Sequence, residues 1–290
     1  MIRYIYNIYI YIICFCLSYY GAFMFQMNAL IEPALYLSVV LALLCKKPAA
    51  KVLLVVATVW MHEMAVLTCV PLYCALEWIC YGKRKTAVMA FVLGVFSFIM
   101  IMTYLATVDE GVIAAYGETL FQYTGKKPGN MTVFEHSLSS SRSTWKTHYM
   151  NHTWWSRCKD AMIFVLLMAS VLSAGFYKKR RDKFDTLVIF LAALSPLALG
   201  FGGWDINRWI FLALLNTSVL WVVFIRDMDM MINRFFLLTS IACFLFSSVY
   251  PLDNPKFAYR NFNETMQAAT HINDYILGHR TVPRFDCGKP

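Results

Sequence analysis

Apolar runs of membrane-spanning length recur along most of this chain, and they constrain its fold more than any other feature. Runs such as 86–108 and 208–225 carry almost no charge over the ~20 residues that a helix needs to cross a bilayer. Inside hydrocarbon, backbone groups must satisfy their hydrogen bonds internally, as helices do. The chain is 59% hydrophobic and only 15% charged, which is unusual for a soluble domain. The sequence therefore predicts an all-α, polytopic integral membrane protein.

We expect about eight or nine transmembrane helices, with one bent or re-entrant pair among them. The first run shows no small-residue cleavage site, so it is predicted to be a retained span rather than a signal peptide. The chain starts directly in this run, which leaves open that it belongs to a longer protein. The candidate spans are 4–25, 29–45, 52–82, 86–108, 160–177, 185–203, 208–225 and 234–250.

The positive charge of the chain predicts its orientation. The net charge is +9, but the basic residues cluster in short segments between apolar runs, which favours the positive-inside rule over nucleic-acid binding. Both flanks of 52–82 are basic, so a bent pair that turns near Trp60 to Glu63 is favoured over one long tilted helix. The predicted cytoplasmic clusters are Lys46–Lys51, Gly82–Lys85, Lys178–Lys183 and the surroundings of Arg226.

With this orientation the chain divides into two parts. Residues 1–250 are predicted to form the transmembrane domain, which includes a large external loop at 109–159. Residues 251–290 are predicted to form an external tail with a short amphipathic helix, because apolar residues recur there at helical spacing. Cys158 and Cys287 both fall outside the predicted spans, where they could pair in an oxidising compartment.

His62 and Glu63 lie inside the long apolar stretch WMHEMAVLTCVPLY. A carboxylate within such an apolar stretch costs several kcal/mol of free energy unless it pairs with a cation or contacts water. We therefore expect a catalytic or ligand-binding pair that faces an aqueous cleft. The alternative is a polar pair that packs helices together through hydrogen bonds. The stretch has no second histidine at HExxH spacing, so no metal site is predicted.

The segment GGWDINRW places Asp205 and Arg208 between two apolar runs. At this spacing both side chains can share a helical face. The planar guanidinium of Arg208 can donate two parallel hydrogen bonds to a phosphate, which Asp205 would help to position. Trp204 and Trp209, which flank this pair, are predicted to bind substrate. The alternative is a salt bridge that caps the helix, with both tryptophans as interface anchors. Glu32 is predicted to enter the same cleft as a substrate-binding residue, unless it is an interfacial acid at a helix start.

The expected external loop is basic and aromatic, with Arg142 and Trp145 as its predicted substrate-binding residues. Tryptophan faces stack on sugar rings, and cations attract anionic head groups. Anchoring at the membrane interface is the alternative. His148 and His152 stand four residues apart but lack an evident third ligand, so neither a metal nor any other cofactor is predicted.

Two short motifs resemble one group of membrane proteins. The stretch from His62 to Pro-Leu-Tyr at 71–73, and the segment GWDINRW, look like motifs of EpsG-like and Wzy-type bacterial surface-polysaccharide polymerases. In layout the resemblance covers residues 28–225. It implies a many-helix fold with an outward-facing cleft where lipid-diphosphate-linked oligosaccharides meet. It also implies catalytic roles for His62, Glu63, Asp205 and Arg208.

The expected function is polymerisation of lipid-linked oligosaccharide repeats at the outer face of the bacterial inner membrane. The expected partners are a polyprenyl-diphosphate-linked oligosaccharide, membrane lipid, a chain-length regulator and other polysaccharide-assembly proteins. Three alternatives stay open: a GT-C type transferase that uses lipid-phospho-sugars, a flippase for a lipid-linked sugar, and a non-catalytic assembly partner.

Overall fold

The computed structural model describes residues 2–16, 32–106, 152–180, 182–201 and 206–246, which form helices and turns without any strand. Three helical stretches are long and apolar enough to cross a membrane, and several shorter apolar helices accompany them. The length and composition of these helices are compatible with a membrane protein. The expected total of eight or nine crossings stays a prediction. The three long stretches are Arg84–Tyr104, Lys159–Lys178 and Arg208–Asp227.

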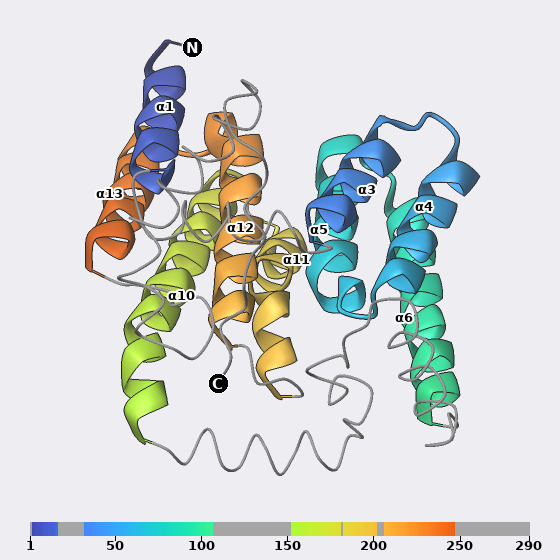
Figure 1. Ribbon diagram of the computed structural model, residues 1–290. Helices are drawn as coiled ribbons and strands as arrows, with labels where there is room; N and C mark the ends of the chain where they lie inside the picture. Colours follow the sequence, from blue (N-terminus) through green and yellow to red (C-terminus); the bar gives the residue numbers. More distant parts are fainter. Residues whose placement is uncertain (1, 17–31, 107–151, 181, 202–205, 247–290) are drawn as a thin grey trace, which may run out of the picture. The chain divides into compact units, whose positions relative to one another are not determined.

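The first group of helices follows the chain through short turns (Figure 1). The helix α4 begins at Pro48, a position where the missing N–H of proline costs nothing. Gly82 ends α5 in the left-handed region, with φ of 66°, where glycine lacks the Cβ that would clash. The group consists of α3 (Glu32–Leu44), α4 (Pro48–Met61), α5 (Ala65–Tyr81) and α6 (Arg84–Ala106).

The predicted bend in the stretch 52–82 is present. The helix α4 ends at Met61, His62 adopts an extended conformation, and α5 begins at Ala65. The stretch is therefore a hairpin and not one long tilted helix. At 1.5 Å per residue, α4 is about 21 Å long and α5 about 26 Å, so both are shorter than a ~30 Å hydrocarbon core.

The second group comprises α10 (His152–Arg180), α11 (Lys183–Leu194), the 3₁₀ helix η2 (Ser195–Phe201), α12 (Ile206–Phe224), η3 (Ile225–Asp227) and α13 (Met230–Phe246). The helix α1 (Ile2–Cys16) packs against α13. Two boundaries differ from the expectations. The end of the loop expected at 109–159 is helical, because α10 starts at His152. The span expected at 185–203 stops being α-helical at Leu194, because Pro196 cannot donate to the carbonyl of Ala192.

The helix α12 lies at the centre of the second group and contacts α5, α10, α11 and η2. Its Trp221 stacks on Phe236 of α13, with ring centroids 4.8 Å apart. Asn233 accepts a hydrogen bond from the indole N–H of Trp221 and donates to the carbonyl of Ile225, which fixes the turn after α12. The buried core of this group therefore includes satisfied polar groups as well as apolar side chains.

Asn216 of α12 joins the two groups of helices. Its side chain is fully buried, accepts a hydrogen bond from the Tyr36 hydroxyl at 2.7 Å, and donates to the carbonyls of Thr68 and Ala192 at 2.9 and 3.0 Å. The Ala192 carbonyl is the one that Pro196 leaves without its helical partner. Asn216 therefore satisfies a group that the proline exposes.

The described helices have two chemically different ends. Lys46, Lys83, Lys178 and Arg226 all lie at or beside the turns on one side, which we call the basic end. The opposite end holds the start of α3, the turn between α4 and α5, and the start of α12. The tail predicted at 251–290 lies outside the described residues, and so do the amphipathic helix expected there and Cys287.

Candidate functional site

Glu32 and Arg208 form an ion pair between the first turn of α3 and the first turn of α12. Both Nε and Nη2 of Arg208 donate to Oε1 of Glu32. The two side chains are largely buried, with exposed fractions of 5% for Glu32 and 18% for Arg208. The guanidinium carbon also lies 5.5 Å from the ring centroid of Trp209. The pair therefore connects helices from the two groups.

Two buried polar atoms beside this pair have no hydrogen-bond partner within the described part of the chain. One is Oε2 of Glu32, and the other is the indole Nε1 of Trp209. A buried acceptor or donor without a partner costs about 1–3 kcal/mol. A sugar hydroxyl can donate one hydrogen bond and accept another, so this is the ligand chemistry that would suit both atoms.

His62 and Glu63 occupy the turn between α4 and α5. Nδ1 of His62 lies 3.1 Å from Oε2 of Glu63, and the exposed side-chain fractions are 26% and 41%. The backbone N–H of Met64 also points at Nδ1, at 3.3 Å. One nitrogen cannot donate and accept at once, and the shorter contact to a charged oxygen favours Nδ1–H as donor to Glu63.

The ionisation of Glu63 follows from this neighbour. Burial alone would raise the pKa of Glu63, but the hydrogen bond from His62, the electrostatic attraction of that side chain and a backbone hydrogen bond together lower the pKa below its ordinary value. Glu63 is therefore a carboxylate at neutral pH. With Nδ1 of His62 bound to Glu63, Nε2 is the nitrogen that can accept a proton.

Both polar pairs lie at the end of the helices opposite the basic end. The helix α3 starts at Glu32 and α4 ends at Met61, and these two helices pack against each other in opposite directions. The Ser38 hydroxyl lies 4.0 Å from the sulfur of Met61, so the turn at His62 is within two helical turns of Glu32. That the two pairs share one cleft stays a prediction.

The remaining predicted site residues cannot be placed. Asp205, Trp204, Arg142 and Trp145 lie outside the described residues. Asp205 was the expected partner of Arg208, and the structure supplies Glu32 as one partner instead. Within the described ranges, no three His, Cys, Asp or Glu side chains gather into a metal-binding group.

A second buried ion pair is located at the basic end. Nζ of Lys51 lies 2.9 and 2.7 Å from the two carboxylate oxygens of Glu77, and the exposed fractions are 2% and 0%. The ammonium also lies 4.9 Å from the ring centroid of Tyr81. The contacts of Glu77 are those of a structural ion pair that holds α4 against α5.

Comparisons of the chain with protein-family models, with curated proteins and with solved structures find no match. Any functional assignment must therefore come from the chemistry of these side chains and from the two motifs quoted above.

Proposed function

We propose that the chain is a membrane glycosyltransferase that polymerises lipid-linked oligosaccharide repeats at the outer face of a bacterial inner membrane. One observation carries the proposal: the Glu32–Arg208 and His62–Glu63 pairs lie at the same end of the helices, opposite the basic turns. Basic turns favour the cytoplasm, so both pairs would face outward. The resemblance of the motifs around His62 and Arg208 to surface-polysaccharide polymerases suggests the substrate class.

The proposed reaction transfers a glycan from a polyprenyl diphosphate to a second lipid-linked repeat. A hydroxyl oxygen of the acceptor sugar forms a bond to the anomeric carbon of the donor. The bond from that carbon to the diphosphate oxygen breaks, and its electron pair leaves with the diphosphate. The acceptor hydroxyl gives its proton to a base. The reaction needs a base on one side of the anomeric carbon and positive charge on the other.

The residues would divide these roles. His62 would take the proton on Nε2, while Glu63 holds Nδ1 and stabilises the imidazolium that forms. Arg208 would stabilise the negative charge on the departing diphosphate, which competes with Glu32 for the guanidinium. Glu32 would hold Arg208 through Oε1 and accept a sugar hydroxyl on Oε2. Asp205 would help to position the phosphate at Arg208, a role that rests on its spacing and on the resemblance.

The Glu32–Arg208 ion pair also favours a second candidate, a non-catalytic assembly partner in which this pair only packs helices. The two candidates differ in what the substitution Arg208→Lys would do. Lysine keeps the charge that Glu32 needs, but it loses the planar fork that suits a diphosphate. A packing role therefore predicts normal polymer with Arg208→Lys, whereas a catalytic role predicts loss of polymer.

The test is expression of Glu63→Gln, His62→Asn and Arg208→Lys at normal membrane levels in the native host, followed by analysis of surface glycan length. The expected result is single repeat units in place of polymer. Absence of outer-face repeats altogether would instead indicate a flippase. Lys178→Ala, which removes an exposed ion pair with Asp229 at the basic end, is the matched control and should leave polymer length unchanged. Full-length polymer from all three site variants would overturn the proposal.

A further inference from the structure

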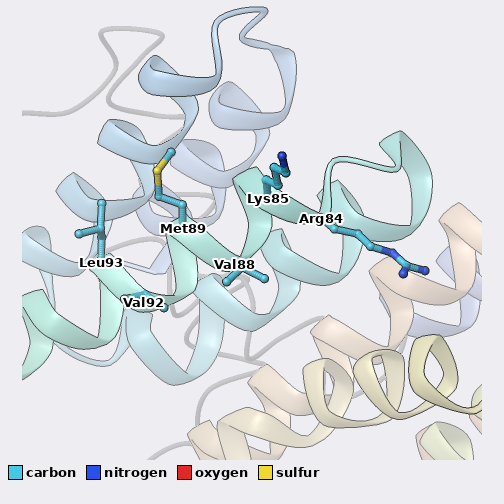
Figure 2. A pocket seen from close by; sticks show the side chains of 6 residues that line it. All are labelled: Arg84, Lys85, Val88, Met89, Val92 and Leu93. Carbon is cyan, nitrogen blue, oxygen red and sulfur yellow. The ribbon is translucent and has the colours of Figure 1, made fainter.

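The surface of α6 carries a shallow, open hollow of about 580 Å³ near the start of the helix (Figure 2). Two stripes of residues at i, i+4 spacing line it, and a cation stands at the head of each stripe. Figure 2 shows Arg84 extending away from Lys85, toward a neighbouring helix. The stripes are Arg84, Val88 and Val92, and Lys85, Met89 and Leu93.

The hollow lies on a face that the rest of the protein leaves uncovered. Of the apolar stretch in α6, 28% is buried, compared with 72% of the stretch in α12. The covered face of α6 carries small residues, Ala87, Ala90 and Gly94, and a Cβ on Gly94 would meet Val70 of α5 at 3.3 Å. The four apolar residues of the hollow are all exposed. In a membrane, this face contacts lipid.

The head of the hollow carries excess positive charge. The segment 83–85 is Lys-Arg-Lys. Arg84 lies 3.8 Å from Asp185 and 4.9 Å from the ring centroid of Trp78, so part of its charge is balanced. Lys85 is exposed and forms no ion pair within the described part of the chain. An anionic group at Lys85 would therefore meet an unbalanced cation directly above an apolar surface.

We propose that this hollow binds one anionic phospholipid of the leaflet at the basic end. The phosphate would lie at Lys85, and one acyl chain would follow Met89 and Leu93. From Lys85 to Leu93 the helix rises about 12 Å, slightly less than half of a ~30 Å hydrocarbon core. The hollow thus has its charge at head-group level and its apolar lining within one leaflet. This inference does not depend on glycosyl transfer, because it concerns the other end of the protein.

The test is native mass spectrometry of the full chain, purified in mixed micelles with equal amounts of phosphatidylglycerol and phosphatidylcholine. The wild-type chain should retain phosphatidylglycerol in preference to phosphatidylcholine. Lys85→Ala should lower the retained phosphatidylglycerol about five-fold, the usual effect of one cation near an anionic lipid surface. Leu93→Asn should lower it as well, because it removes an exposed chain contact without opening the core.

Lys46→Ala is the matched control, since it removes an exposed cation at the same end but away from the hollow. It should leave lipid retention unchanged. Equal losses from Lys46→Ala and Lys85→Ala would overturn the proposal and indicate diffuse surface charge. Unchanged retention by Lys85→Ala, or equal retention of the two lipids, would also overturn it. Glycerol phosphate, added as a competitor, should displace the lipid only in part. Full displacement would show a head-group site in which the apolar stripes take no part, and it would also overturn the proposal.

Discussion

The protein holds two buried ion pairs that differ in how completely their carboxylates are bound. At the basic end, both oxygens of Glu77 lie within 3 Å of Nζ of Lys51, and both side chains are almost fully buried. At the opposite end, Oε1 of Glu32 takes both contacts from Arg208, while Oε2 has no partner within the described residues. The first pair is saturated and the second is not.

This difference separates a structural role from a binding role. A buried ion pair repays its desolvation only when additional hydrogen bonds satisfy its polar atoms. Lys51 and Glu77 meet that condition with each other and fix α4 against α5. Glu32 meets it only in part, because Oε2 has no partner within the described residues, so a ligand with a hydroxyl group could complete the set. The comparison predicts that substitutions at the first pair lower stability, and that those at the second mainly lower activity.

The largest expected effect comes from Lys51→Met. This substitution leaves the carboxylate of Glu77 buried without a partner, which should lower the free energy of unfolding by about 3–5 kcal/mol. Thermal unfolding in detergent, followed by size-exclusion chromatography, measures the loss. The double variant Lys51→Met, Glu77→Leu should recover most of it, because no buried charge remains. If Lys51→Met alone is as stable as the wild type, the carboxylate of Glu77 is solvated. The two ion pairs would then not differ in how completely their carboxylates are bound.

The next effect concerns Arg208→Lys. Loss of the fork toward the diphosphate should slow transfer about 100-fold, the usual cost of one donor at a developing negative charge. The unfolding temperature should change much less than for Lys51→Met, because lysine still neutralises Glu32. An in vitro assay with lipid-linked repeats measures the rate. If Arg208→Lys lowers stability as much as Lys51→Met and leaves transfer intact, both pairs are structural.

A third substitution, Asn216→Leu, probes the contact between the two groups of helices. Leucine leaves the Tyr36 hydroxyl without its acceptor, and it leaves the Ala192 carbonyl with only the longer hydrogen bond from the Ser195 hydroxyl at 3.3 Å. We expect a loss of about 1–3 kcal/mol in the free energy of unfolding. The matched control is Thr217→Val, which removes a hydroxyl that bonds only to its own helix, at Ala213. Its loss should be clearly smaller, and equal losses would deny Asn216 a special role.

The sequence predicts the helical class and the bend at His62, because apolar runs and basic flanks depend on local composition alone. It also predicts the end of α4, where two polar side chains interrupt an apolar stretch. It misses the end of α11, although Pro196 is a visible signal, because the apolar run continues to residue 203. Proline removes one backbone donor without changing hydrophobicity, so an argument based on apolar length overlooks it.

The partners of the charged residues are harder to predict from the sequence. Glu32 and Arg208 are separated by 176 residues, so no helical spacing connects them. The local pattern suggested Asp205, three residues away from Arg208, since local pairs are the ones that periodicity can show. The pairing of Glu77 with a nearby basic residue, Lys51, is easier to predict, because the predicted hairpin brings its two ends together. A buried charge requires a partner, and the arrangement of the helices determines which residue that partner is.

The smallest expected effect is the pH dependence of the His62–Glu63 pair. The pKa of Glu63 is lower in the folded protein than its ordinary value of 4.5. Its contribution to stability should therefore be complete above about pH 4.5 and should disappear as the pH falls through the lowered pKa. The effect should be slight, because 41% of the Glu63 side chain is exposed. Unfolding temperatures of the wild type and Glu63→Gln, measured from pH 7 to pH 3.5, should differ at neutral pH and converge at the acid end. A constant difference across this range would mean that Glu63 acts through its shape and not its charge, and would remove the basis for its role beside His62.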